Sequence, residues 1–203
     1  MSQKPYDAAY FDRWYRGPDA PRGEVELRRD VALAVAAAES VLARELTGVL
    51  DVGAGEGRWQ PVLQQLRPTA SYLGVEPSEY AVERFGATRN LCHGTFATLD
   101  ELAFDDPFDL VVCADVLHYL SEAEIDAGLD TFVDLVGGVA YIEISTADDQ
   151  AEGDRMDFQA RPAVWYRERL HRAGLIPVGL QLYVHREVAA DLEALDLVDS
   201  RRT

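Results

Sequence analysis

The chain has 203 residues and is 48% hydrophobic, so it is long enough for one domain with a buried core and too apolar for a disordered chain. Its 36 acidic residues outnumber 19 basic ones, and the formal charge of −17 argues against nucleic-acid or membrane partners. We find no membrane-spanning apolar run and no leader pattern, and we expect a cytoplasmic protein. Cys92 and Cys113 stand in apolar contexts that favour reduced, buried thiols.

An aromatic segment over residues 1–23 is the first predicted feature. Five aromatic side chains fall within ten positions, at Tyr6, Tyr10, Phe11, Trp14 and Tyr15. Such a segment either packs against the core or forms a lid over a ligand, and both interpretations stay open. If it is a lid, Tyr10 and Trp14 are candidate ligand contacts, because the face of an aromatic ring attracts cations.

A long amphipathic helix is predicted over Glu24–Leu46, because apolar residues recur there every three or four positions. An apolar strand, Val49–Val52, follows and leads into a glycine-rich loop. In this loop Gly53 permits a sharp turn, Gly55 lets the backbone approach a ligand, and Gly57 lets the next helix pack closely. The loop predicts a nucleotide-like ligand at a helix start, although a tight turn without a ligand has the same pattern.

A second helix, Arg58–Leu66, leads to a buried strand that ends in Glu76 and Pro77. Glu76 comes 19 residues after Gly57. An acid at this distance, at the end of the next strand, can accept hydrogen bonds from both hydroxyls of a ribose. The alternative is an ordinary acid at the start of a helix, here one predicted over Glu79–Ala87.

The glycine loop and the acid before it carry a family resemblance. Together they form a D-x-G-x-G-x-G pattern, which resembles motif I of the class I S-adenosylmethionine-dependent methyltransferases. The dinucleotide fingerprint has another spacing, G-x-G-x-x-G. The resemblance covers roughly residues 45–185 and implies S-adenosylmethionine as the cofactor. The cofactor contacts that it implies here are Asp51, Gly53, Ala54, Gly55 and Gly57, with Glu76 and Pro77 at the ribose.

Two later stretches extend the resemblance. Thr95 and Phe96 stand in the family region that holds the adenine, although the family often has Asp in place of Thr95. The strand Phe108–Asp115 resembles the family's fourth strand, and Ala114 and Asp115 at its end are candidate cofactor contacts. The N-P-P-Y motif that many amino-group methyltransferases carry here is absent, which argues against the usual methylation of DNA or glutamine.

His118 follows this strand and is the candidate catalytic residue. Imidazole titrates near neutral pH, so His118 can act as a general base for an acceptor that arrives protonated. The alternative is a hydrogen-bonded structural histidine at the entry to a helix. That helix begins with a capping box of Ser121 and Glu124 and is expected to end at Gly137–Gly138, before a strand over Val139–Ile144.

The C-terminal part of the chain gives weaker patterns. Residues 145–161 are polar and irregular, and we expect them either to border the ligand crevice or to form a mobile acidic loop. A helix is predicted over Ala163–Ala173, with its basic side chains on a solvated face. One strand over Ile176–Val184 and a helix over Val188–Leu195 follow, which leaves the family's seventh strand in doubt.

The alternation of strands and helices predicts a doubly wound α/β fold with a mostly parallel, Rossmann-like sheet of six or seven strands and helices on both faces. We expect a single domain over residues 1–203, with a lid over 1–23 and an α/β core over 24–203. The His and Cys residues show no metal-ligand spacing, so no metal site is predicted.

The resemblance implies transfer of a methyl group from S-adenosylmethionine to an O or N atom of a small-molecule acceptor. Two other classes of function stay open. One is a non-catalytic protein that binds S-adenosylmethionine as a sensor or partner. The other is an NAD-dependent oxidoreductase, against which the glycine spacing and Asp51 argue. The acceptor and the oligomeric state are not predicted.

Overall fold

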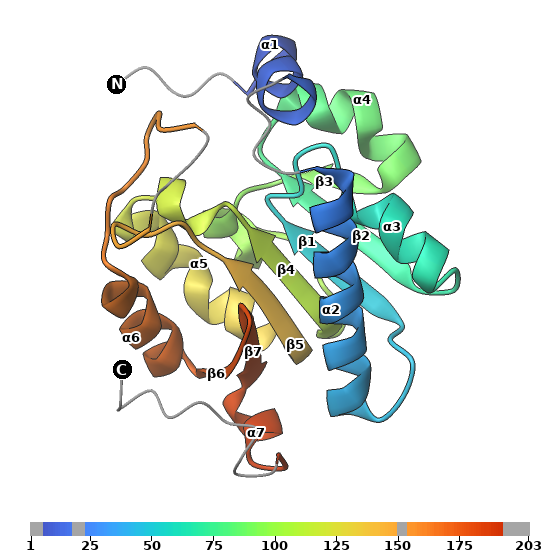
Figure 1. The fold of residues 1–203 in the computed structure, drawn as a ribbon, viewed down its shortest axis with the longest axis vertical. Coiled ribbons are helices and arrows are strands. Elements are labelled where there is room, and N and C mark those ends of the chain that lie inside the picture. The colour runs from blue at the N-terminus through green and yellow to red at the C-terminus, as the bar shows by residue number, and fades with distance from the viewer. Residues whose placement is uncertain (1–5, 18–22, 150–153, 193–203) are drawn as a thin grey trace.

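A seven-stranded sheet forms the centre of the protein, for which the computed structural model describes residues 6–17, 23–149 and 154–192 (Figure 1). The strand order is β3-β2-β1-β4-β5-β7-β6. The first five strands pair in parallel, and β7 runs antiparallel to both of its neighbours. The strands are β1 Gly48–Val52, β2 Ser71–Glu76, β3 Leu91–His93, β4 Phe108–Ala114, β5 Val136–Glu143, β6 Leu175–Gly179 and β7 Leu182–His185.

Helices cover both faces of the sheet, as predicted. The longer ones are α2 Glu24–Leu42, α3 Trp59–Leu66, α4 Glu79–Arg89, α5 Glu122–Asp134 and α6 Ala163–Ala173. The short ones are α1 Ala8–Phe11, η1 Asp12–Arg16, η2 Phe96–Glu101, η3 Leu117–Tyr119 and α7 Arg186–Ala189. Buried side chains of α2 and α3 form one core cluster with one face of the sheet, and those of α5 and α6 form a second cluster with the other. The doubly wound, mostly parallel fold is therefore confirmed.

Burial on both faces explains the continuous apolar runs of the central strands. In β4, Leu110 and Val112 belong to the α2 side of the core, whereas Val111 and Cys113 belong to the α5 side. All four side chains are fully buried. A parallel strand between two helical layers favours an apolar residue at every position, and β4 has one at each position from Leu110 to Ala114.

The prediction that Gly137–Gly138 end a helix is wrong, because both residues lie in β5. The preceding helix α5 ends at Asp134, and β5 starts at Val136 opposite Phe108 of β4. A Cβ at Gly138 would lie 2.4 Å from the carbonyl oxygen of Asp109. The glycine thus permits a close approach of neighbouring strands, which a sequence pattern cannot distinguish from a helix stop.

The single strand predicted over Ile176–Val184 is two strands, β6 and β7, joined by Leu180 and Gln181. Both joining residues have positive φ, at 51° and 67°, as in the two-residue turns that match the twist of a hairpin. The sequence hides this turn, because Leu-Gln stands where Asn-Gly is usual. The hairpin supplies the seventh strand that the sequence left in doubt.

Smaller differences concern helix ends and the chain's last part. Helix α2 stops at Leu42 rather than Leu46, since Ala43 adopts the left-handed conformation with φ 53°. Only α7, Arg186–Ala189, is seen near the helix predicted over Val188–Leu195, whose end lies outside the described residues. Cys92 and Cys113 are free thiols. Among the described residues, no helix has the length and apolar character needed to cross a membrane.

Candidate functional site

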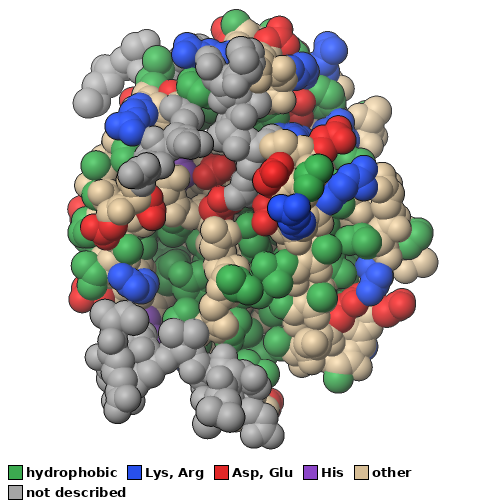
Figure 2. Space-filling view, viewed as in Figure 1, with side chains coloured by type: hydrophobic (Ala, Val, Ile, Leu, Met, Phe, Trp, Pro, Cys, Tyr) green, Lys and Arg blue, Asp and Glu red, His purple; other side chains and the backbone are tan. Residues whose placement is uncertain are grey.

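A pocket of about 480 Å³ lies at the carboxyl ends of β1, β2, β4 and β5. In an open α/β sheet this edge is where ligands bind. Acidic side chains gather in the upper half of the face seen in Figure 2, which is viewed in the direction of Figure 1. The pocket brings together most of the residues predicted from the sequence: Tyr10, Trp14, Asp51, Gly53, Ala54, Gly55, Glu76, Pro77, Phe96, Ala114, Asp115 and His118.

The glycine loop has the backbone geometry that its sequence predicts. Gly53, Gly55 and Gly57 all have positive φ, at 76°, 58° and 67°. Residues with a Cβ rarely adopt this conformation, so the loop needs glycine at each position. A Cβ at Gly53 would also lie 2.3 Å from a methyl group of Val116. Backbone conformations that glycine adopts without strain, together with close packing, therefore form this loop at the floor of the pocket.

Glu76 is held by the two loops on either side of it. Its Oε2 accepts a hydrogen bond from the Gly55 N–H at 2.7 Å, and its Oε1 accepts one from the Ser78 N–H at 2.9 Å. The side chain is buried, and this burial raises its pKa despite the two hydrogen bonds, which lower it. Both carboxylate oxygens keep further acceptor capacity toward the pocket.

Asp51 is a second buried acid on the same floor, only 3% exposed. The Tyr72 hydroxyl donates to its Oδ2 at 2.7 Å. Burial raises the pKa of Asp51 to about 7, although the hydrogen bond from Tyr72 lowers it. Asp51 therefore titrates near neutral pH and can carry a full charge when a cation binds beside it.

The aromatic segment covers the side of the pocket that the glycine loop forms. Phe11 is buried and stacks on Tyr80 of α4, with ring centroids 5.7 Å apart. The Ser78 hydroxyl donates to the Tyr6 carbonyl at 2.6 Å, and Arg16 forms an ion pair with Glu56 of the glycine loop. The segment is thus fastened to the loops that follow β1 and β2. Residues 1–5 and 18–22 of the predicted lid lie outside the described residues.

Tyr15 is a contact that the sequence did not single out. Its hydroxyl lies 2.1 Å from the place where a Cβ of Gly55 would be, so the phenol sits directly against the glycine loop. Burial, and then the nearby carboxylates of Glu76 and Asp115, raise the pKa of Tyr15. The phenol therefore stays protonated at neutral pH and can donate a hydrogen bond.

The side of the pocket away from the glycine loop is built by η3 and the loop after β5. His118 is 2% exposed, and its Nδ1 accepts a hydrogen bond from the Ser145 N–H at 3.2 Å. The Gln159 N–H donates to the His118 carbonyl, and the Tyr119 hydroxyl donates to the Asp154 carbonyl at 2.9 Å. The loop thus folds back over η3, as expected for a segment that borders the crevice.

The hydrogen bond to His118 argues against the predicted general-base role. A neutral imidazole whose Nδ1 accepts a hydrogen bond carries its proton on Nε2. The nitrogen with a free lone pair is then occupied by a backbone donor, and the other nitrogen has no lone pair to offer. An imidazole in this arrangement can donate a hydrogen bond from Nε2 but cannot accept a proton there.

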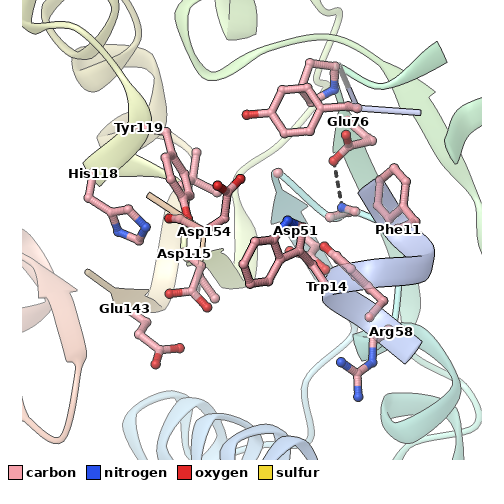
Figure 3. A pocket seen from close by; sticks show the side chains of 18 of the residues that line it. Phe11, Trp14, Asp51, Arg58, Glu76, Asp115, His118, Tyr119, Glu143 and Asp154 are labelled. Atoms are coloured by element: carbon pink, nitrogen blue, oxygen red, sulfur yellow. Dashed lines mark hydrogen bonds between the residues drawn. The ribbon is translucent and has the colours of Figure 1, made fainter. Parts of the chain in front are cut away.

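Three carboxylates stand on this side of the pocket: Asp115 after β4, Glu143 at the end of β5, and Asp154 in the following loop. Figure 3 shows them beside His118 and Tyr119, across the pocket from Trp14 and Arg58. Of the three, only Asp115 was predicted from the sequence. Glu143 gave a signal that was missed, since an acid that ends a buried parallel strand lies at the ligand edge of the sheet.

Two predicted contacts do not line the pocket. The Thr95 hydroxyl lies 3.0 Å from the Thr98 hydroxyl, and the two residues form a capping box that begins η2. Gly57 faces Leu91, whose methyl group would lie 3.0 Å from an added Cβ. Gly57 thus permits a close approach of Leu91 in β3, whereas close packing of the following helix was predicted. Within the described ranges no cluster of three or more His, Cys, Asp or Glu side chains is arranged to hold a metal ion.

Comparisons with known proteins agree with this geometry. Residues 50–138 match a family model described as a methyltransferase domain. No curated protein sequence gives a significant match. Among solved structures, DesVI of Streptomyces venezuelae is 17% identical, with a TM-score of 0.62 over 88% of this chain and 98% of that one.

Two further similar structures were solved with ligands of this family. The plantazolicin methyltransferase BamL, in complex with a triazolic desmethylPZN analogue and S-adenosylhomocysteine, is 17% identical, with a TM-score of 0.58 over 74% of this chain and 63% of that one. CalS10 from Micromonospora echinaspora, bound to S-adenosylmethionine, is 20% identical, with a TM-score of 0.52 over 76% and 62%. The chain thus spans less than two thirds of either protein.

At these identities the likeness to solved structures establishes the fold, while the family model covers the strands and loops that build the cofactor side of the pocket. Residues 50–138 therefore match a methyltransferase domain, and the described chain has the fold of solved S-adenosylmethionine-dependent methyltransferases.

Proposed function

We propose that this protein transfers a methyl group from S-adenosylmethionine to an O or N atom of a small-molecule acceptor. The observation that carries the proposal is the hydrogen bond between the Gly55 N–H and the buried carboxylate of Glu76, because it joins the two motifs of the cofactor site in one pocket. Glu76 then accepts from the ribose hydroxyls, and Phe96 packs beside the adenine. Asp51 faces the methionine end of the cofactor.

Residues 6–17 act as the lid in this proposal. They place the rings of Tyr10, Trp14 and Tyr15 in the pocket, and Arg16 and Tyr6 fasten them to the loops beneath. Aromatic rings around a sulfonium provide cation–π attraction and exclude water. The lid thus supplies the dry, cation-binding surroundings that methyl transfer needs.

The reaction requires little acid–base chemistry. A nucleophile attacks the methyl carbon in line with the carbon–sulfur bond, and the sulfonium leaves as a neutral thioether. Catalysis then rests mostly on orientation, which is worth up to about 7–11 kcal/mol in well-aligned cases. A pocket that holds both partners rigidly is sufficient for most of the rate enhancement.

Calorimetric titration with S-adenosylhomocysteine, with NAD as the parallel control, tests the cofactor. We expect micromolar binding of the first and none of the second. Because a sensor protein would bind in the same way, the second experiment follows formation of S-adenosylhomocysteine from S-adenosylmethionine across a panel of small acceptors. Binding without turnover on any acceptor would favour the non-catalytic alternative.

Glu76→Gln is expected to weaken S-adenosylhomocysteine binding by about 1.5–3 kcal/mol, the usual cost of losing hydrogen bonds to a charged group. In the parent protein the N–H groups of Gly55 and Ser78 both donate to the Glu76 carboxylate. In the variant the amide NH₂ group would face one of these two donors, so that hydrogen bond would be lost. Calorimetry measures the change. Glu79→Gln, at an exposed position at the start of α4, is the matched control. An affinity of Glu76→Gln within twofold of the parent would remove the ribose assignment.

His118 is proposed to position the acceptor side of the pocket rather than to take a proton. His118→Asn is expected to keep the turnover number within about tenfold of the parent, because an amide oxygen can accept the Ser145 N–H as Nδ1 does. A general base typically contributes 100-fold or more. The pH dependence of the turnover number distinguishes the two roles. If His118→Asn lost an ionisation near pH 6.5 and its turnover number fell by 100-fold or more, His118 would be the general base after all.

A further inference from the structure

We propose that Tyr72 is a positioning residue for the cofactor: its hydroxyl orients the Asp51 carboxylate and favours its ionised form, which binds a positively charged group of the ligand. The hydroxyl donates to Asp51 Oδ2 at 2.7 Å, and Tyr72 is not among the described residues that line the pocket. Tyr72 therefore acts on the ligand only through Asp51. The inference rests on the proposed function, since the ligand is S-adenosylmethionine.

The register of the sheet explains how a core side chain reaches the pocket floor. In the parallel pairing of β1 and β2, Asp51 lies opposite Gly74, and Val49 lies opposite Tyr72. Side chains two positions apart on a strand point to the same face, so Tyr72 and Asp51 share the face of the sheet that α2 and α3 cover. Because Gly74 has no side chain, the phenol extends along β2 to the carboxylate.

Gly74 keeps open the space that this contact needs. A Cβ there would lie 2.8 Å from the Ala54 Cβ and 2.4 Å from a methyl group of Leu91, so a larger residue would displace them. It would also lie 3.3 Å from the Tyr72 hydroxyl, which therefore passes close over the glycine. The strand around the phenol is fixed as well, because Asn90 Nδ2 donates to the Tyr72 carbonyl at 2.5 Å. The phenol is thus held by its neighbours, as a positioning residue must be.

Asp51 keeps one oxygen for a ligand. Oδ2 accepts from Tyr72, whereas Oδ1 accepts no hydrogen bond from the residues that the structure describes. Asp51 lines the pocket (Figure 3) and is 3% exposed, and surroundings of low dielectric strengthen its attraction for a cation once it is ionised. A hydrogen bond to the charged form of an acid favours that form. The Tyr72 hydroxyl therefore supports the charge that the ligand needs.

Two residues of β2 and one of β4 face Asp51 as titratable groups: Tyr72, Glu76 and Cys113. Burial raises the pKa of Tyr72 and the pKa of Cys113, so both stay protonated at neutral pH. Burial also raises the pKa of Asp51 to about 7, while the hydrogen bond from Tyr72 lowers it and the charge of Glu76 raises it. Asp51 thus changes its charge near neutral pH.

Glu76 is a second buried acid of the pocket, and burial raises its pKa too. Its hydrogen bonds come from the backbone N–H groups of Gly55 and Ser78, which a change at Tyr72 leaves in place. Further charged side chains nearby lie on other elements: Arg58 before α3, Arg89 at the end of α4, Asp115 after β4, Glu143 at the end of β5, and Asp154. All of them remain when Tyr72 is changed, so a shift in pH dependence after that change reports on Asp51.

Affinity for S-adenosylmethionine is therefore expected to depend on pH through Asp51. The ionised form binds the cation, so affinity rises as pH rises through about 7 and levels off above it. Tyr72→Phe removes the hydrogen bond and keeps the ring, and loss of a hydrogen bond to a charged group raises the midpoint by about one pH unit or more. Binding should then be about tenfold weaker than in the parent at pH 6, and the gap should narrow to about twofold at pH 8.5.

Calorimetry at pH values from 6 to 8.5 measures the midpoint, and thermal unfolding checks that each variant is folded. Tyr183→Phe is the matched control, since it removes a hydroxyl from β7 at a residue that does not line the pocket. The double variant of Asp51→Asn and Tyr72→Phe should bind as Asp51→Asn alone does, because no carboxylate is left to orient.

The two ligands of the site identify the charged group. A loss of affinity in Tyr72→Phe that S-adenosylmethionine and S-adenosylhomocysteine share assigns Asp51 to the ammonium group of the amino-acid part. A loss confined to S-adenosylmethionine assigns Asp51 to the sulfonium, which S-adenosylhomocysteine lacks.

The inference is wrong if the parent shows no midpoint, if Tyr72→Phe keeps the midpoint of the parent, or if its loss of affinity is the same at pH 6 and pH 8.5, as a purely structural role of Tyr72 would produce. If Tyr72→Phe does not fold, Asp51→Asn decides alone. Its affinity is expected to vary by less than about twofold over this pH range, and a midpoint near pH 7 that persists in it would overturn the inference. Failure of both ligands to bind the parent at every pH would instead contradict the proposed function itself.

Discussion

Gly55→Val is expected to abolish binding of S-adenosylhomocysteine. Gly55 has φ 58°, and a residue with a side chain pays roughly 1–2 kcal/mol for this conformation, more when it is β-branched. The new Cβ would also lie 2.1 Å from the Tyr15 hydroxyl, so either the loop or the aromatic segment must move. Movement of the loop breaks the hydrogen bond from the Gly55 N–H to Glu76. Together these effects are expected to cost roughly 3 kcal/mol or more, above 100-fold in affinity.

Calorimetry on the variant measures this loss, and thermal unfolding shows that the protein is still folded. Gly48→Ala is the matched control, because a Cβ at Gly48 meets only ordinary contacts, with Ser71 at 3.4 Å and Phe108 at 3.5 Å. It stands at the start of β1, whereas Gly55 follows its end. If Gly55→Val kept its affinity within tenfold of the parent while Gly48→Ala kept all of it, the glycine loop would not be the cofactor site.

The cofactor side of the pocket was predictable because its parts are local in sequence. A strand, a glycine turn and a helix start lie within a short stretch, and each glycine has a backbone reason that holds in any context. Glu76 could be placed for the same reason, since the length of one helix and one strand fixes where the next acid lies. The structure adds what the sequence could not give, namely the hydrogen bond by which Gly55 orients Glu76.

The acceptor side was not predictable in the same way, because tertiary contacts assemble it. Asp115, Glu143 and Asp154 come from three different segments, and no spacing rule connects them. His118 was chosen for the ordinary pKa of imidazole, whereas its proposed positioning role rests on a hydrogen bond from the backbone N–H of Ser145, 27 residues away. A sequence motif therefore predicts the ligand that a whole family shares. The acceptor site, in contrast, is formed by side chains that come together only in the folded protein.

The same contrast applies to the sheet. The central strand β4 was clear, because burial on both faces leaves a continuous apolar run. The β6–β7 hairpin was missed, since Leu180 and Gln181 adopt positive φ without the residues that usually signal it. Tertiary pairing of β7 with β5 compensates for this local strain. The intrinsic φ/ψ preference of a residue is therefore overridden where strand pairing in the sheet fixes its backbone conformation.

Asp51→Asn is expected to stabilise the protein at pH 8 by up to about 4 kcal/mol. Burial raises the pKa of Asp51 to about 7, whereas an aspartate in an unfolded chain has a pKa of about 3.9. Below pH 4 the group is protonated in both states and has no effect. Between pH 4 and 7 the unfolded chain loses this proton while the folded protein keeps it, so the free energy of unfolding falls as pH rises. Above pH 7 the full cost of the buried charge is present.

Asparagine removes this titration and still offers an oxygen to the Tyr72 hydroxyl, so the gain in stability should appear above pH 7 and vanish toward pH 4. Urea unfolding at pH 5 and pH 8 measures it. Asp109→Asn is the control with the opposite sign, because hydrogen bonds from Arg44 and Thr47 outweigh burial there and lower the pKa of Asp109 to about 2. Its carboxylate stabilises the fold above pH 4, so that variant should be less stable at pH 8. Equal pH dependence of the free energy of unfolding in Asp51→Asn and the parent would show that Asp51 is already ionised at acidic pH in the folded protein. The pKa of Asp51 would then not be raised by burial.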